Sequence, residues 1–171
     1  MATSTSSPRS ATARRAAVAA LLAVLLAGPG CAPTPESVII GEVVAIHDGD
    51  TLSVLTGGTT VRVRLACIDA PEQGQAFGSR ARERLAEEAM RRTVRVEVVD
   101  HDDYGRTVGR VWADGSLVNL ELVRAGLAWH YTYHCPDDRA LAAAEMEAKT
   151  ARRGLWAEPG PVPPWQWRRR R

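Results

Sequence analysis

The chain has 171 residues, of which 45% are hydrophobic and 25% charged, a composition that predicts one globular domain with short appendages. Its formal net charge is +2, but the first 30 residues contribute three arginines and no acid, which leaves 19 of the 22 basic groups against all 20 acidic groups. This balance excludes a general basic field as the means of holding a polyanion. Local cationic groups and metal would be needed instead.

Residues 1–30 have the pattern of a signal peptide. The arginines precede an apolar run, residues 16–27, that is too short to span a bilayer. The small residues Gly28 and Gly30 favour cleavage before Cys31. Three outcomes stay open: a membrane-anchored lipoprotein carrying its lipid on Cys31, a secreted protein, or an uncleaved anchor. Each of them places the mature domain outside the cytoplasm, so we expect an exported protein.

Three strands are predicted after a proline-containing linker, residues 31–37. Residues 38–46 are apolar with one acid, residues 51–55 follow an Asp-Gly turn, and an alternating strand around Val61 follows a Gly-Gly turn. Because the connections are tight, we expect an antiparallel meander.

The remaining chain alternates between two periodicities. Apolar residues recur at helical spacing over residues 78–92, and further helices are predicted at 117–125 and 137–153. Strands are predicted at 93–99 and 107–112. The tail, residues 158–171, is rich in Pro, Trp and Arg; we predict no regular structure there, with the tryptophans packed on the body and the arginines in water.

This element order predicts an α+β protein that is mainly a β-barrel: an OB-fold, five-stranded and partly open, with three helices. The competing layout is a three-stranded meander with a separate hairpin. Closure is favoured because five short strands, each with one buried face, need one another.

A candidate site lies around residues 61–72. Arg64 and Asp69 are five residues apart, so on an unbroken strand they would face opposite ways. If both serve one site, the backbone must bulge or bend between Ala66 and Ile68.

Four carboxylates stand in short turns next to strand ends, and carboxylates are ligands that hard divalent cations prefer. They are Asp48, Asp50, Asp69 and Glu72. Taken singly, each motif is also typical of an ordinary polar turn, and Arg64 and Arg106 are typical of a solvated strand face and a turn ion pair. Their conjunction favours a site.

Four motifs stand in order along the chain. They are Asp48-Gly49-Asp50-Thr51, Arg-Leu-x-x-Ile-Asp-x-Pro-Glu at 64–72, Asp103-Tyr104-Gly105-Arg106, and Val-Asn-x-x-Leu-Val-Arg-x-Gly-Leu-Ala at 118–128. In this order and spacing, over residues 38–157, the chain resembles the staphylococcal nuclease (thermonuclease) family. The ending Pro-Trp-Gln-Trp-Arg at 164–168 also resembles that of many bacterial members.

The resemblance implies a calcium site. Asp50 and Asp69 would bind Ca²⁺ through their carboxylates, and Ala70 through its backbone carbonyl. Asp48 matches an acidic residue that acts on the metal through water. Because the family often has threonine at the position of Ala70, and the ligand is backbone, that change is expected to be mild.

The resemblance also implies the catalytic and substrate-binding residues. Glu72 falls on the general base, while Arg64 and Arg106 fall on the two arginines that grip the scissile phosphate. Tyr131 and Tyr133 lie where the family has tyrosines lining the nucleotide pocket, offset by about one residue.

By this resemblance we expect a monomeric, calcium-dependent endonuclease that hydrolyses DNA and RNA with low sequence specificity. The alternative is a catalytically silent module that binds nucleic acid or peptides on the same barrel. One departure is the short segment 73–77, where the family's best-known member has a longer loop bearing lysine; Lys149 is the only lysine here. Whether Cys67 and Cys135 pair, or Cys67 stays a buried thiol, is left open.

Overall fold

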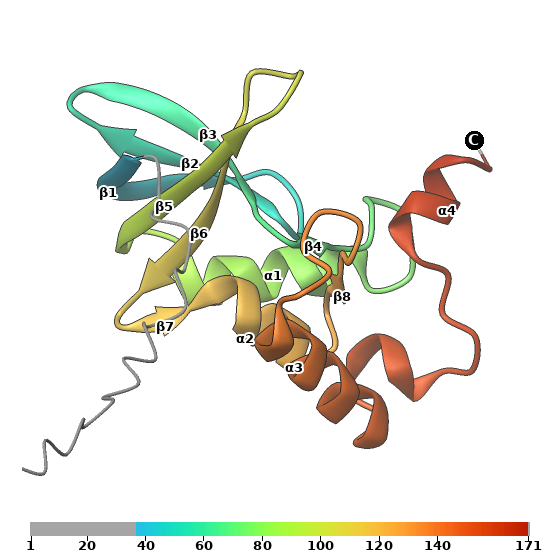
Figure 1. Cartoon of the computed structure of the whole chain (residues 1–171). Helices are drawn as coiled ribbons and strands as arrows, with labels where there is room; N and C mark the ends of the chain where they lie inside the picture. Colours follow the sequence, from blue (N-terminus) through green and yellow to red (C-terminus); the bar gives the residue numbers. More distant parts are fainter. Residues whose placement is uncertain (1–36, 171) are drawn as a thin grey trace, which may run out of the picture. The chain divides into compact units, whose positions relative to one another are not determined.

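The computed structural model describes residues 37–170, so the predicted signal peptide, Cys31 and all but the last residue of the linker lie outside the described residues. Five strands form the body of the fold: β1 (Ser37–Ile46), β2 (Thr51–Thr56), β3 (Thr59–Leu65), β5 (Thr93–His101) and β6 (Thr107–Ala113). β1, β2 and β3 form the predicted antiparallel meander, and β5 and β6 pair as a hairpin (Figure 1).

The sheet closes into a barrel. Its order is β3-β2-β1-β5-β6, and β3 also pairs with β6 in parallel, over Val63 to Leu65 against Thr107 to Gly109. The prediction of a five-stranded barrel is therefore confirmed, and the alternative of a meander with a separate hairpin is wrong. Closure gives each short strand two partners and removes exposed edges.

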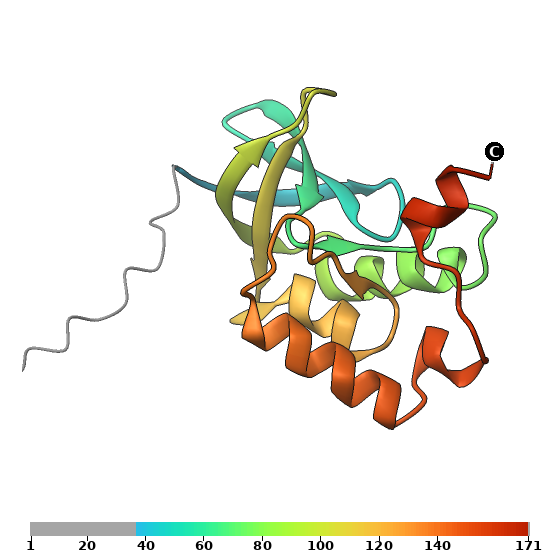
Figure 2. The same ribbon diagram turned by 45° about the vertical axis from the view of Figure 1, so that its right-hand side comes forward.

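Three helices lie at one end of the barrel: α1 (Gly78–Ala89), α2 (Val118–Arg124) and α3 (Arg139–Thr150) (Figures 1 and 2). α1 buries the apolar face that its periodicity predicts, through Ala81, Leu85 and Ala89. α3 begins where Asp138 accepts a hydrogen bond from the backbone N–H of Leu141, at 3.0 Å. All three end one to three residues earlier than predicted.

A glycine, Gly126, follows the C-terminal cap of α2, Ala125. Gly126 has φ +70°, and a Cβ there would lie 2.3 Å from the carbonyl oxygen of Arg153. Only glycine accepts both the left-handed backbone and this close approach.

Short elements complete the fold. Two-residue strands β4 (Ile68–Asp69) and β8 (Trp129–His130) pair with each other, β7 (Ser116–Leu117) extends the hairpin of β6, and η1 (Gly154–Ala157) is one turn of 3₁₀ helix. In the described part of the chain no helix is long and apolar enough to cross a membrane.

The tail contradicts the sequence prediction, because it contains a helix, α4 (Pro164–Arg168). Pro164 stands in the first turn, where the missing N–H costs nothing and the fixed φ suits a helix. Trp165 packs against Trp129 and Tyr131, with ring centroids 6.4 and 5.4 Å apart. The tail therefore gains helical structure by docking on the body.

Cys67 and Cys135 form a disulfide with Cα atoms 5.4 Å apart, which resolves the open alternative. It joins the exit of β3 to the segment that follows β8. Tyr131 strengthens the same junction, since its backbone N–H donates to the carbonyl of Cys67 at 2.8 Å.

Candidate active site

The backbone turns sharply between β3 and β4. Cys67 has φ +65°, a conformation uncommon for any residue other than glycine, so the predicted bend between Ala66 and Ile68 is confirmed. The bend brings Arg64 and Asp69 to the same side. Their Nη2 and Oδ1 atoms lie 3.2 Å apart.

Asn119 holds this bend in place. Its Nδ2 donates to the carbonyls of Ala66 (2.9 Å) and Gly109 (3.3 Å), and its Oδ1 accepts from the backbone N–H of Val111 (2.9 Å). With only 1% of its surface exposed, this amide links the segment just after β3 to β6 and α2. Sequence reasoning missed this role, although a polar residue between Val118 and Leu120 at a helix start was the available signal.

Asp50 reaches the same place from the other turn. Its carboxylate accepts from the hydroxyl of Thr51 (2.9 Å) and from the backbone N–H of Ala70 (3.1 Å), and Arg64 Nη2 lies 3.5 Å away. One guanidinium therefore faces both Asp50 and Asp69. Two turns that are separate in the sequence therefore bring the carboxylates of Asp50 and Asp69 to the same guanidinium. The sequence motifs predicted that these two residues belong to one site.

These carboxylates are crowded and poorly hydrated. Burial raises the pKa of the Asp69 carboxyl, and the charge of Asp50 raises it further, while Arg168 and Arg64 oppose the shift. Burial, with the charge of Asp50, raises the pKa of Asp48 to about 6. Excess negative charge in a low-dielectric place is relieved by a cation.

The donor set fits a hard divalent ion. Among residues 37–170 no three His, Cys, Asp or Glu side chains are grouped so as to hold a metal. A site here would therefore use the carboxylates of Asp50 and Asp69, the carbonyl of Ala70 and water. That combination of oxygens is one that Ca²⁺ accepts.

Glu72 lies in the loop between β4 and α1. Its backbone N–H donates to Gln75 Oε1 at 3.0 Å, and Gln75 Nε2 donates to the carbonyl of Val162 at 2.5 Å, so the loop is fixed to the tail. Gly78 is required here, because a Cβ would lie 2.2 Å from the Glu72 carbonyl oxygen.

Arg168 contradicts the prediction that the tail arginines point into water. Its Nη2 lies 2.8 Å from Asp69 Oδ2, and its Nη1 lies 3.2 Å from Asp69 Oδ1 and 2.5 Å from Glu72 Oε1. A guanidinium from the C-terminal tail thus bridges two predicted site residues.

Arg106 is held elsewhere. Its Nε donates to Asp102 Oδ2 at 2.7 Å, and its guanidinium lies over the ring of Tyr104, 5.4 Å from the centroid. Among the described residues it makes no ion pair with Asp50 or Asp69. In the structure Arg106 therefore forms an ion pair within its own turn, and its contact with the scissile phosphate stays a prediction.

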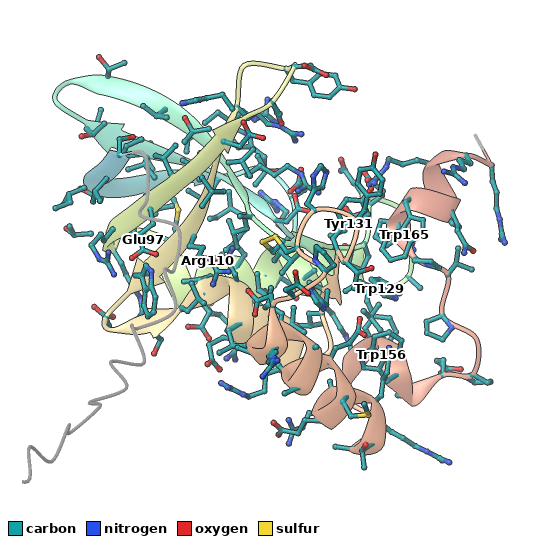
Figure 3. The ribbon with its side chains drawn as sticks, in the orientation of Figure 1. Glu97, Arg110, Trp129, Tyr131, Trp156 and Trp165 are labelled. Atoms are coloured by element: carbon teal, nitrogen blue, oxygen red, sulfur yellow. A yellow bond between two sulfur atoms is a disulfide. The ribbon has the colours of Figure 1, made fainter. Side chains whose placement is uncertain are left out.

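Tyr131 and Tyr133 follow β8 on the side of the tail. Figure 3 shows Tyr131 beside Trp165 of α4, with Trp129 and Trp156 below them, and Trp129 contacts both tryptophans. The ring of Tyr133 lies 6.1 Å from that of Tyr131 and is 81% exposed. Tyr131 packs inward, and Tyr133 faces solvent.

Comparisons with known proteins identify the family of this chain. A profile of the family described as "Staphylococcal nuclease homologue" matches residues 62–158. The chain is 45% identical to "Micrococcal nuclease" of Shigella flexneri, over 94% of this chain and 95% of that protein. It is 45% identical to "Protein ParB" of Escherichia coli, over 90% and 89%. It is also 43% identical to an "Uncharacterized endonuclease" of Haemophilus influenzae, over 75% and 72%. The chain belongs to the staphylococcal nuclease family.

Proposed function

We propose that this protein is a calcium-dependent endonuclease that hydrolyses phosphodiester bonds of DNA and RNA with low sequence specificity. The observation that carries the proposal is the meeting of Asp50 and Asp69 at Arg64. The family membership, and the word nuclease in the name of a relative at 45% identity, support the same activity.

Asp50, Asp69 and the Ala70 carbonyl would hold the calcium ion. When bound, the ion supplies Lewis-acid stabilisation and orients an attacking water. Glu72, at the rim of the site, would take the proton of that water. Its carboxylate must first release Arg168, which now contacts it.

Arg64 would stabilise the charge that develops on the phosphate. A planar guanidinium donates in a fork that matches two phosphate oxygens, and its effect is greatest where charge increases in the transition state. Arg106 would add a second fork after leaving Asp102, since charge-assisted hydrogen bonds to phosphate offset the loss of that ion pair.

Tyr131 and Tyr133 would contact the bases. Stacking on aromatic rings is tolerant of sequence, because every base has a π-face. This agrees with low sequence specificity. The exposed ring of Tyr133 is free to take a base without displacing packed neighbours.

We infer export from the Cys67–Cys135 disulfide, since such bonds persist in oxidising compartments. The N-terminal pattern favours two forms over an uncleaved anchor: one anchored in the membrane through a lipid on Cys31, and one secreted. We propose DNA and RNA as the partners, and a monomer as the working form.

Cleavage of single-stranded DNA, double-stranded DNA and RNA should be measured across a calcium titration, with protein that begins at Ala32. We expect cleavage of all three that ends in chelator. Activity unchanged by chelator would overturn the metal mechanism. Binding of nucleic acid without any cleavage would instead establish the alternative, a catalytically silent binding module.

A further inference from the structure

The tail carries a positive charge into the site from the far end of the sequence. Arg168 is 99 residues from Asp69, yet its two terminal nitrogens contact both oxygens of that carboxylate, at 2.8 and 3.2 Å. The same guanidinium reaches Glu72 at 2.5 Å. Asp69 is only 1% exposed, so this contact lies at a protected carboxylate rather than on an open surface.

The arrival of Arg168 at this place is fixed by packing. Pro164 is buried, and Trp165 lies against the rings of Trp129 and Tyr131. Upstream, the Val162 carbonyl accepts a hydrogen bond from the buried side chain of Gln75. Because the tail is anchored at Val162, just before α4, and at Pro164 and Trp165, in the first turn of α4, Arg168 is held near the site at a high effective concentration.

The contact uses the oxygens that a metal would need. Asp69 already faces Arg64, and two further bonds from Arg168 occupy both of its oxygens. A divalent ion and a guanidinium cannot both take the same lone pairs, and each relieves the same crowding of negative charge.

We propose that Arg168 is a further residue of this active site, and that its guanidinium competes with the divalent cation for the carboxylate of Asp69. The inference rests on the proposed function, because it assumes the calcium site. The apparent affinity for calcium is then the intrinsic affinity multiplied by the fraction of molecules in which Asp69 is free of Arg168. Occupancy of about nine-tenths lowers it about tenfold.

Calcium binding should be measured by titration calorimetry without nucleic acid, in protein that begins at Ala32. Arg168→Gln should bind Ca²⁺ about five- to tenfold more tightly than the parent. Arg168→Lys should fall between them, since an ammonium cannot bridge two carboxylates with a planar fork. Arg169→Gln is the matched control, because Arg169 is exposed and makes no ion pair with any described residue.

Arg169→Gln also measures the through-space effect of losing one positive charge, which salt screens. The gain in Arg168→Gln should exceed it and persist at raised ionic strength. Trp165→Ala gives a second approach: it keeps the charge but loosens the anchor, so calcium binding should again tighten. Far-UV circular dichroism checks that each variant is folded.

Equal calcium affinity in Arg168→Gln and Arg169→Gln, or weaker affinity in Arg168→Gln, overturns the competition. If the parent still cleaves only with calcium, the proposed function survives that result. If no variant binds calcium and cleavage ignores chelator, the metal mechanism and the role of Arg168 fail together.

Discussion

Two guanidiniums reach the Asp69 carboxylate, and they are placed by different means. Arg64 lies five residues away on a barrel strand, and the bend at Cys67 turns Asp69 back towards it. Arg168 lies at the other end of the chain, on a short helix that is docked by aromatic packing. The first contact follows from local backbone geometry, and the second from the packing of distant segments.

The two arginines also differ in how firmly their side chains are held. Arg64 sits in a strand paired on both sides, with β2 and with β6. Arg168 has a side chain that is 45% exposed, against 17% for Arg64. This contrast is consistent with the proposal that Arg64 stays in place to contact the phosphate, while Arg168 makes a contact that the metal displaces.

The largest effect is expected at Glu72, which contacts the tail arginine but not the strand arginine. Glu72→Gln keeps the shape of the side chain and removes the proposed general base, so turnover should fall about 10²- to 10⁴-fold with the fold intact. Single-turnover cleavage in saturating calcium measures it, with the exposed Glu158→Gln as control. A melting temperature well below that of the Glu158→Gln control would mean that Glu72 stabilises the fold and is not the base.

Arg64→Ala should lower turnover by about 10²-fold or more, because a preorganised charge at the phosphate is removed. Arg62→Ala is the matched control, since Arg62 is exposed two residues earlier on the same strand. The contrast with Arg168 is the test: Arg64→Ala loses catalysis, whereas Arg168→Gln gains calcium affinity. Equal turnover in the two strand variants would remove Arg64 from the site.

Local rules account for what the sequence could predict. Strand alternation and tight turns predicted the barrel, and the five-residue spacing of Arg64 and Asp69 predicted the bend. These features depend on neighbours in the chain. Helix ends were predicted less well, because fraying depends on the packing of the last turn.

The parts that were missed depend on distant partners. A tail rich in Pro and Trp has no apolar period of its own, so α4 forms only against Trp129 and Tyr131. The site position of Arg168 follows from that docking. Asn119 likewise gains its role from three backbone groups that no local pattern brings together.

Removal of the Asn119 side-chain amide should lower the stability of the fold, because among the described residues Asn119 bonds only backbone groups. Asn119→Ala leaves the buried N–H of Val111 without its observed partner, and should lower the free energy of unfolding by about 2–3 kcal/mol. Urea denaturation measures this. Gln166→Ala, in the exposed part of α4, is the matched amide truncation and should change little. If both variants were equally stable, Asn119 would not be what holds the bend.

The smallest effect tests the crowding of negative charge that makes both guanidiniums necessary. Asp48 accepts a hydrogen bond from the Asp50 backbone N–H at 3.0 Å, which an asparagine oxygen can also accept. Burial, with the charge of Asp50, raises the pKa of Asp48 from 3.8 to about 6. A raised carboxyl pKa means that this group favours the folded state below about pH 4, and that the benefit is lost as pH rises through about 6.

Asp48→Asn should therefore be more stable than the parent at pH 7 without calcium, by about 1–2 kcal/mol, and nearly equal to it at pH 4. Urea denaturation at the two pH values, with the exposed Asp103→Asn as control, measures the difference. A bound cation would neutralise the same charge, so saturating calcium should shrink the gap at pH 7. If the difference in stability between Asp48→Asn and the parent is the same at both pH values, Asp48 ionises normally. The crowding of negative charge around Asp50 would then not be what calcium and Arg168 relieve.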